Sequence, residues 1–514
     1  MKLKKTMALL LAAVLSIGLM TGCNSSSKSE DTGKELVYGT GVYTTTASLD
    51  PAEASYNGWF TLRYGIGETL FKINDDGSVE PWLVSEYKKV DDTTWELVLK
   101  DNITFSNDKK VDAEAVKASL ERVLANKDVS AGAILSIDSI EADGNTLTIK
   151  TTEPNPALIN QLADPDLVIL DSEAEDMKTK PVGTGPFVVE SFDEKQCVVN
   201  KNENYWDGDV KLDKVTVEYI EDNDTIASSL QSGDIDIAGG LSFTNLQKFE
   251  NDDNYKVDTN ATSRVYMLYY NFKNELLNDK NIRKAIDICI DKDSYVDSLL
   301  QGSGVVAKGP FPSTMDIGKD VKDNGYDVEE AKKLLEEAGC KDTDNDGILE
   351  KDGKKLSFDI ITYSSRAELK DISTALQDKL KEVGIEIANV NVYEAVEDQL
   401  GSGDFDICAY SWTTCPIGDP YYFIGYCYGA DSDCNYGKYD NEEVDKLVKE
   451  LAVEFDQDKR VELANEIVQL GNDDVAFSYV AHLNKGYAMK SGVSGFEQTS
   501  SDYYELNKDT DIQE

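Results

Sequence analysis

The sequence predicts an α/β fold divided into at least two lobes, and three observations indicate this. Short alternating strands and amphipathic helices intermix from Leu36 onward without a simple repeat. The chain has 514 residues, whereas a single hydrophobic core stops growing near ~250 to 300 residues. In the later half, helices stand between strands, as in layered α/β proteins. We therefore expect separate cores built from strands and helices.

The elements follow from apolar alternation in strands and from helical spacing of apolar residues. In the first half we predict strands at residues 95–105, 146–151, 196–200 and 214–220, and a helix at residues 113–125. In the later half we predict helices at residues 281–300, 367–383, 441–453 and 457–470, and strands at residues 357–363, 386–392 and 406–411. Asp327 and Glu330 have the spacing of a capping box and open a further helix that ends at Gly339.

The first 22 residues have the pattern of a secretory signal. A positively charged start precedes the apolar run 7–20 and the small residues Thr21 and Gly22. This run is shorter than the ~20 residues that a spanning helix needs. Cys23 follows directly, as in a lipoprotein signal, so we expect its acylation and a lipid anchor at the extracytoplasmic face of the cell membrane. An ordinary signal or an uncleaved anchor is the alternative, and residues 23–35 are expected to form a flexible tether.

Charge and cysteine content narrow the function classes. The formal net charge is -46 at pH 7, so the surface repels phosphate backbones and no nucleic-acid partner is expected. Seven cysteines remain besides Cys23, which is an odd number in a chain with core enough to fold without disulfide bonds. Cys427 and Cys434 flank a polar loop, and both a disulfide and a reduced pair are compatible with that position. The cysteine spacing lacks the short pairs of a zinc site.

A series of short motifs follows in order along the chain. They are LDPA at 49–52, GETLF at 67–71, EPWL at 80–83, VGTGPF at 182–187, NENYW at 202–206, GDIDI at 233–237, YNF at 270–272, IRKAI at 282–286 and IDK at 290–292. In this order they resemble the extracellular solute-binding proteins of family 5, which serve ABC importers of peptides and of nickel chelates. Each motif alone is weak, but the shared order is specific. The resemblance extends from about residue 36 to the end.

The resemblance implies an α/β, two-lobed fold of the type II periplasmic-binding-protein kind, with an extra small domain in the first lobe and a hinge between the lobes. It divides the chain into a signal at 1–22, a tether at 23–35, lobe I from 36–54, 183–262 and 493–514, an extra subdomain at 55–182, and lobe II at 263–492. The turn at 180–186 and a strand at 264–272 are the candidate lobe boundaries. Gly183 and Gly185 stand between prolines and are expected to permit positive φ at the crossover.

The function that the resemblance implies is solute capture for an ABC importer. The protein would close around short peptides and deliver them to the permease and ATPase complex, and a nickel chelate or other metal chelate is the alternative solute. We expect a monomer without catalytic activity, because serine or cysteine catalysis would need a histidine near the nucleophile and His482 is the single histidine. The strand-like surroundings of His482 favour a structural role.

Candidate ligand-binding residues come from three places that the resemblance implies: the loop before Leu49, where relatives place first-lobe contacts, the hinge strand that begins at Arg264, and the segment from Tyr410 that resembles the ligand-binding strand of peptide-binding relatives. They are Tyr43, Thr44, Arg264, Tyr410, Ser411, Trp412, Thr413, Thr414, Cys415, Asp419 and Tyr421. An edge strand that ends in a proline-broken turn leaves backbone groups free for an extended ligand. Cys415 stands where peptide-binding members commonly place an acid for the ligand's ammonium group, and Asp419 could supply that charge instead. Arg264 could bind a ligand carboxylate or form a structural ion pair.

One acidic turn has the spacing of a calcium loop. Asp342, Asp344 and Asp346 occupy positions 1, 3 and 5, and a glycine follows. Position 12 is Gly353 where a bidentate glutamate is needed, although Glu350 could partly compensate. A polar turn and a weak structural calcium site both remain open, and no other cofactor is expected.

Overall fold

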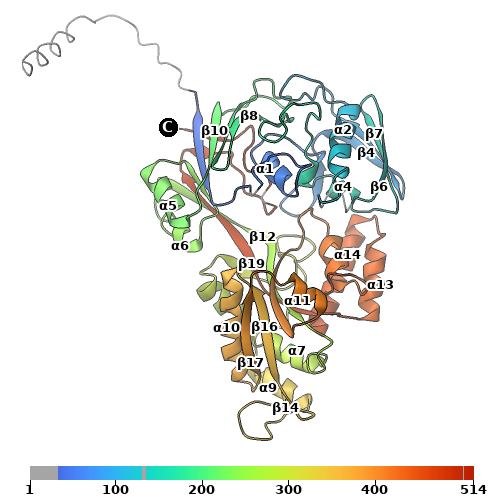
Figure 1. Cartoon of the computed structure of the whole chain (residues 1–514), viewed down its shortest axis with the longest axis vertical. Coiled ribbons are helices and arrows are strands. Elements are labelled where there is room, and N and C mark those ends of the chain that lie inside the picture. The colour runs from blue at the N-terminus through green and yellow to red at the C-terminus, as the bar shows by residue number, and fades with distance from the viewer. Residues whose placement is uncertain (1–32, 45, 130–134, 502, 514) are drawn as a thin grey trace, which may run out of the picture.

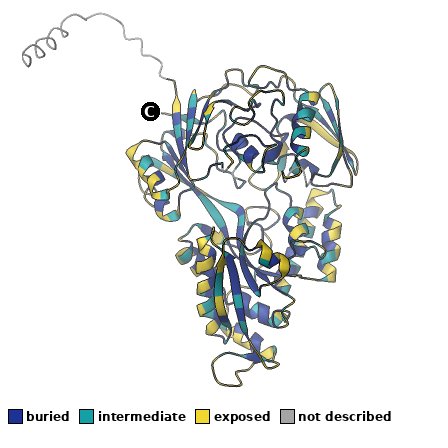
Figure 2. Ribbon diagram, viewed as in Figure 1, coloured by how far each residue is buried: buried dark blue, intermediate teal, exposed yellow. Residues whose placement is uncertain are grey.

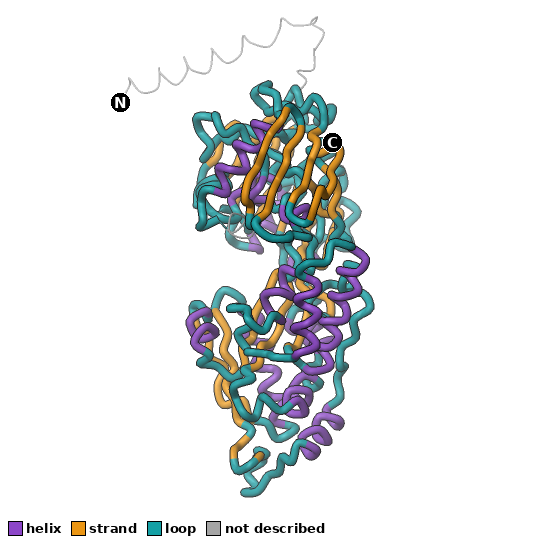
Figure 3. The backbone as a smooth tube through the Cα atoms, turned by 90° about the vertical axis from the view of Figure 1, so that its right-hand side faces the viewer, coloured by secondary structure: helices purple, strands orange, loops and turns teal. Residues whose placement is uncertain are grey.

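The computed structural model describes residues 33–44, 46–129, 135–501 and 503–513. Two lobes lie one above the other and join along one side (Figures 1 and 3). The predicted signal, Cys23 and most of the predicted tether lie outside the described residues. Within the described ranges, no helix has the length and apolar character needed to cross a membrane.

One eleven-stranded mixed sheet runs through both lobes. Its strands are β1 (Glu35–Thr40), β8 (Phe187–Phe192), β9 (Gln196–Lys201), β10 (Lys214–Tyr219), β11 (Ile237–Gly239), β12 (Tyr255–Tyr270), β13 (Gly304–Val306), β16 (Ser357–Tyr363), β17 (Glu386–Tyr393), β18 (Ile407–Thr413) and β19 (Phe477–Lys490). Their order is β17-β16-β18-β12-β19-β11-β1-β10-β9-β8, and β13 pairs with β19. The first lobe contains β1 and β8 to β11, and the second lobe contains β16 to β18 (Figure 1).

The two lobes are joined by the long antiparallel strands β12 and β19. The strand predicted to start at Arg264 is the second half of β12, which begins earlier, at Tyr255. The β12–β19 pairing is interrupted between Ala261 and Val265. An interruption of this kind bends a strand and turns residues out of the ladder. The chain at Arg264 therefore lies at an irregular point between the lobes.

A small domain adjoins the first lobe and has its own four-stranded sheet, β4-β5-β7-β6. Its strands are β4 (Val84–Asp91), β5 (Thr94–Leu99), β6 (Ile137–Asp143) and β7 (Thr146–Thr151), and β2 (Phe71–Ile73) and β3 (Val79–Pro81) form a separate pair. Helix α2 (Ala113–Leu124) is capped by Asp112, whose carboxylate accepts the Ala115 N–H at 3.1 Å. Val116, Leu120 and Val123 share one face of α2, so this face enters the domain's core.

Helices cover the outer sides of the sheet in both lobes. They are α5 (Asn223–Ser232) and α6 (Phe243–Leu246) beside the first lobe, and α7 (Lys280–Asp287), α8 (Lys292–Ser294), α9 (Val328–Glu337), α10 (Ala367–Lys381), α11 (Glu397–Ser402), α12 (Tyr421–Tyr428), α13 (Glu442–Leu451) and α14 (Gln457–Asp474) in the second. Figure 2 shows mostly buried strands and helices with exposed outer sides. Helix α10 buries Leu369, Ile372, Leu376 and Leu380, an amphipathic spacing.

The single helix predicted over residues 281–300 is wrong in its length. Helix α7 ends at Asp287, and the chain turns before α8 and a π-helical turn at Tyr295–Leu299. The Asp291 carboxylate accepts the Ser294 N–H at 3.2 Å. Short acidic side chains that bond the nearby backbone favour helix starts over helix interiors, so Asp291 caps the start of α8 after α7 has ended at Asp287. The predicted cap at Asp327 is confirmed, since its carboxylate accepts the Glu330 N–H at 2.9 Å.

The glycines of the VGTGPF motif serve close packing. The prediction of positive φ is wrong for Gly183 and Gly185, because neither adopts it. A Cβ on Gly183 would lie 2.2 Å from the Ile66 carbonyl oxygen, and one on Gly185 would lie 2.2 Å from that of Gly65. The Gly185 N–H donates to the Ile66 oxygen at 3.1 Å. The motif therefore packs its backbone against the residues that precede GETLF.

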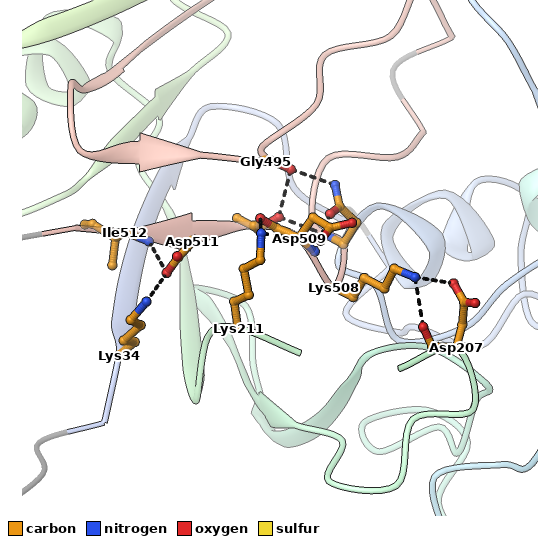
Figure 4. A network of polar contacts seen from close by, with 10 residues as sticks. Lys34, Asp207, Lys211, Gly495, Lys508, Asp509, Asp511 and Ile512 are labelled. Atoms are coloured by element: carbon orange, nitrogen blue, oxygen red, sulfur yellow. Dashed lines mark hydrogen bonds and ion pairs between the residues drawn. The ribbon is translucent and has the colours of Figure 1, made fainter. Parts of the chain in front are cut away.

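The C-terminal segment returns to the first lobe (Figure 4). The Lys34 ammonium binds the Asp511 carboxylate at 2.7 Å, next to the start of β1. The Lys508 ammonium binds the Asp207 carboxylate at 2.7 Å. The short strand pair β20 (Val493–Ser494) and β21 (Asp511–Ile512) closes the segment on itself. These contacts attach the last residues of the chain to the start of β1 and to the loop between β9 and β10.

A buried carboxyl connects two of the motifs. Glu68 of GETLF accepts the Tyr205 hydroxyl at 2.5 Å and the Trp206 indole N–H at 2.8 Å, both from NENYW. Burial raises the pKa of Glu68 from its ordinary 4.5 to about 7. The folded state therefore binds this proton more readily than the unfolded state does.

We expect the free energy of unfolding to decrease by on the order of 3 kcal/mol as the pH rises through the window from about 4.5 to about 7, because Glu68 must then ionise in its buried position. Glu68→Gln cannot titrate, so its stability profile should be flatter over this window. Urea unfolding at several pH values measures the difference. Glu203→Gln, in the exposed part of the NENYW motif that contacts Glu68, is the control and should keep the wild-type slope. Parallel profiles for wild type and Glu68→Gln would contradict this assignment.

Candidate functional site

A cleft of about 410 Å³ lies where the small domain, the β12 junction and the second lobe meet. Its walls come from four parts of the chain, namely the start of helix α1 (Asn57–Arg63), the turn η1 (Pro165–Leu167) after helix α4 (Leu158–Gln161), residues 262–264 of β12, and the segment from the end of β18 to α12. Residues 500, 501 and 503 close one side. The volume is within the range of small-molecule sites, ~300 to 1,000 Å³.

Arg264 is the cationic side chain of this cleft. It lies at the interruption of β12, directly opposite Thr413 of β18, which also lines the cleft. Its guanidinium donates to the Ser411 hydroxyl at 3.4 Å, and among the described residues it has no carboxylate partner. Burial lowers the pKa of Arg264, and the nearby charge of Arg366 lowers it further. A half-buried guanidinium without a counter-ion is a suitable partner for a carboxylate that enters the cleft.

Two acids stand on the small-domain side of the cleft. The Asp166 carboxylate accepts the backbone N–H groups of Tyr56 at 3.0 Å and Gly58 at 3.3 Å. The Asp164 carboxylate accepts the Asp166 N–H at 2.9 Å, which caps the turn η1. Burial raises the pKa of Asp164 to about 6, and burial followed by the charge of Asp164 raises the pKa of Asp166 to about 7. This part of the cleft thus favours a ligand group that donates hydrogen bonds.

Aromatic rings supply much of the remaining cleft surface. Tyr56 has a left-handed backbone (φ 73°) and leaves 70% of its surface exposed. A positive φ at a bulky residue is strained, and such strain is concentrated at functional sites. Trp59 of α1 and Tyr422 of α12 line the cleft from the two sides. These rings offer flat apolar faces on which a ligand ring can stack.

Trp412 lies behind the cleft wall. Its indole N–H donates to the Tyr269 hydroxyl at 2.6 Å. Its ring contacts those of Tyr422 and Phe423 edge-to-face, with centroids 6.3 Å and 6.0 Å away. Trp412 is not among the lining residues, so it supports Tyr422 from behind.

The other predicted residues near the end of β18 are mostly internal. Ser411 is buried under Arg264, and Tyr410 packs against Trp412 with its centroid 6.1 Å away. The Thr414 hydroxyl donates to the carbonyl oxygens of Ser263 at 2.9 Å and Pro310 at 2.7 Å. These bonds fix the irregular part of β12 next to Arg264.

Cys415 and Asp419 occupy buried positions. Burial holds the pKa of the Cys415 thiol well above its usual range, so the thiol is neutral. The Asp419 carboxylate pairs with Arg460 of α14, at 2.5 Å from Nη2 and 3.2 Å from Nε, and both side chains are 2% exposed. The charge of Asp419 is therefore already compensated. Tyr421 begins α12, half-exposed, and its N–H donates to Asp419.

Tyr43 and Thr44 belong to the first lobe. The Tyr43 ring stacks on Phe192 and Tyr219, with centroids 5.9 Å and 5.7 Å away, and its hydroxyl donates to the Asp193 carbonyl oxygen at 2.8 Å. The Thr44 hydroxyl contacts that of Thr46 at 3.0 Å. Neither residue lines the cleft. Of the predicted ligand-binding residues, the structure thus brings Arg264 and Thr413 to the cleft surface.

His482 is fully buried in β19 beside β12 and β13. Burial lowers the pKa of His482 to about 4, so the ring is neutral at physiological pH. It does not line the cleft.

The acidic turn lies at the far end of the second lobe, beside the hairpin β14 (Glu350–Lys351) and β15 (Lys354–Lys355) (Figure 1). Carboxylate oxygens of Asp342, Asp344 and Asp346 lie within 4.8 Å of one another. The Lys355 ammonium ion-pairs with Asp344 at 3.0 Å and with Asp346. Glu350 instead accepts the Thr343 N–H at 2.8 Å. A lysine charge thus already neutralises part of the turn, and calcium binding there stays a prediction.

Sequence reasoning missed the small-domain half of the cleft. Tyr56, Trp59 and Asp164 lie a hundred residues or more before Arg264, and no local pattern links them to it. One signal was available, because Asp164 and Asp166 interrupt an otherwise apolar stretch around Pro165. Two acids in a buried stretch must have donors nearby or face a cavity.

A two-lobed α/β fold with a cleft at the junction is the architecture of the solute-binding proteins. Residues 78–433 match the bacterial extracellular solute-binding proteins, family 5 (middle part), and the chain belongs to this family. The fold expected from the sequence is thereby confirmed.

Three relatives illustrate the range of the family. The nickel-binding protein NikA of Staphylococcus aureus is 34% identical over 99% of both chains, and its structure in complex with Ni(L-His)2 has a TM-score of 0.73 at 33% identity, covering 94% of this chain and 100% of that one. The nickel ABC transporter structure from Bacillus halodurans has a TM-score of 0.85 at 32% identity, covering 93% and 100%. The oligopeptide-binding protein AppA of Bacillus subtilis, solved with a nonapeptide, has a TM-score of 0.70 at 25% identity, covering 94% and 99%.

Proposed function

We propose that this chain is the substrate-binding component of an ABC importer and that it captures a small carboxylate-bearing solute in the cleft at Arg264. The observation that carries the proposal is the Arg264 guanidinium, which faces the cleft and has no carboxylate partner among the described residues. The solute is a nickel complex of an amino acid, with L-histidine as the representative ligand. The lobes close on it by bending at the irregular part of β12.

Three features support a chelate over bare nickel. In the described part of the chain, one cluster has three or more side chains that could ligate a metal. It consists of Asp342, Asp344 and Asp346 and lies at the far end of the second lobe, away from the cleft. Nickel in the cleft would therefore need ligands of its own, for which imidazole nitrogen is well suited. The rings of Tyr56, Trp59 and Tyr422 can pack against imidazole. The similarity to NikA of Staphylococcus aureus over nearly the whole chain supports the same choice.

A short peptide is the second candidate. Strand β18 pairs with β16 only through Ile407 and Cys408, so among the described strands none continues along that edge as far as Thr413. An extended peptide can add to such an edge through its backbone. The similarity to AppA of Bacillus subtilis agrees with this alternative.

Calorimetry separates the two candidates. Nickel with two equivalents of L-histidine should bind the purified protein, with one site per chain, whereas L-histidine alone and a set of dipeptides and tripeptides should give little heat. Heat from a peptide without nickel, together with none from the nickel complex, would assign the protein to peptide capture.

We also propose that acylated Cys23 holds the protein at the extracytoplasmic face of the cell membrane, supported by the signal pattern of the first 22 residues. Labelled fatty acid should be incorporated into wild type and not into Cys23→Ser. Equal labelling of both would contradict the lipid anchor.

A further inference from the structure

Asp164 lines the cleft and uses only one of its two carboxylate oxygens within the described part of the chain. Its Oδ1 accepts the Asp166 N–H at 2.9 Å, and among the described residues no hydrogen bond or ion pair reaches its Oδ2. Asp166 differs, because both of its oxygens accept the Tyr56 N–H, at 3.0 Å and 3.2 Å. Asp166 therefore holds the strained start of α1 in place, and Asp164 remains available to a ligand.

The two acids lack a cation of their own. Neither forms an ion pair with a lysine or arginine within the described ranges, although Asp166 is buried and Asp164 is half-buried. Carboxylates placed together in this way interact unfavourably when both are charged. Burial raises the pKa of Asp164 to about 6, which is consistent with missing compensation. A donor or cation brought into the cleft would supply it.

Arg264 lines the same cleft from β12, whereas Asp164 lines it from the small domain. The cleft thus has a positive and a negative group on different elements. An amino acid carries a carboxylate and an amino group on one carbon, and an amino group that coordinates nickel still keeps its N–H atoms.

We propose that Asp164 determines specificity by accepting an N–H of the solute's amino group while Arg264 binds its carboxylate. The cleft then selects amino-acid-type solutes over simple carboxylates or amine-free chelates. This inference deepens the proposed function and depends on it.

The test compares two nickel complexes by calorimetry, one with L-histidine and one with Nα,Nα-dimethyl-L-histidine, whose amine can coordinate nickel but has no N–H. Wild type should bind the first about 10-fold tighter or more, as a charge-assisted hydrogen bond would give. Asp164→Asn keeps a good capping side chain for η1 and should lose most of this preference. Asp143→Asn removes the same charge from an exposed position of β6 and should behave as wild type.

An unchanged preference in Asp164→Asn would overturn the role of Asp164 while leaving solute capture intact. Equal binding of both complexes by wild type would also overturn it. Failure of wild type to bind either complex would overturn the proposed function, and this inference with it. Circular dichroism of both variants confirms that they are folded.

Discussion

Replacing Arg264 by glutamine is expected to weaken binding of the nickel–histidine complex by about 30- to 150-fold. The change leaves the solute carboxylate without its charged partner in a half-buried site, which costs ~2 to 3 kcal/mol. Folding should be little affected, because Arg264 makes no ion pair among the described residues and its Ser411 contact is long, at 3.4 Å. Calorimetric titration of the purified variant measures the loss.

Arg366→Gln is the matched control. The substitution removes one positive charge near Arg264, as Arg264→Gln does. Arg366 itself does not line the cleft. We expect it to change the dissociation constant less than about 3-fold, since long-range charge effects near a surface are small. If the two variants lost affinity equally, the effect would be due to overall charge and Arg264 would not contact the solute.

The largest stability effect is expected from Asp419→Asn. This change leaves the Arg460 charge buried without its partner, and breaking a buried ion pair in this way costs ~3 to 5 kcal/mol. Arg460 retains its bonds to the carbonyl oxygens of Leu451 at 2.7 Å and Glu454 at 2.9 Å, so the fold should survive with a lower denaturation midpoint. Urea unfolding measures the loss.

Asp445→Asn breaks an exposed ion pair with Lys449 in helix α13 and serves as the control. It should leave the unfolding midpoint unchanged, because exposed pairs contribute little. The Asp419→Asn variant should bind solute as wild type does at temperatures where this variant is folded. If Asp419→Asn instead had normal stability and did not bind solute, Asp419 would be a ligand contact.

The strands could be predicted best where alternation and β-branched residues coincide. The predicted bounds of β7 and β16 are those of the structure, and β10 differs by one residue. The break after α7 was missed because apolar spacing continues through it, while the competing bond from Asp291 is local and leaves that spacing unchanged. The first half of β12 was missed because none of its first eight residues is buried.

The candidate site could be predicted only on the side formed by β12 and β18. Thr413 follows from the match to the ligand-binding strand and Arg264 from its place at the start of the hinge strand, and the pairing of these two strands brings both residues to the cleft. Tyr56 and Asp164 reach the cleft through tertiary packing of α1 against η1, which leaves no periodic signal in the sequence. Trp412 and Asp419 were chosen by chemical type, and their partners Tyr269 and Arg460 are visible only in the fold.

The most direct measurement is anomalous diffraction at the nickel absorption edge from crystals grown with nickel and L-histidine. We expect one strong peak in the cleft between β12 and the small domain, with a carboxylate oxygen ~3 Å from the Arg264 guanidinium. Nickel peaks only at the Asp342–Asp346 turn, or a cleft that stays empty under saturating nickel and L-histidine, would contradict this expectation.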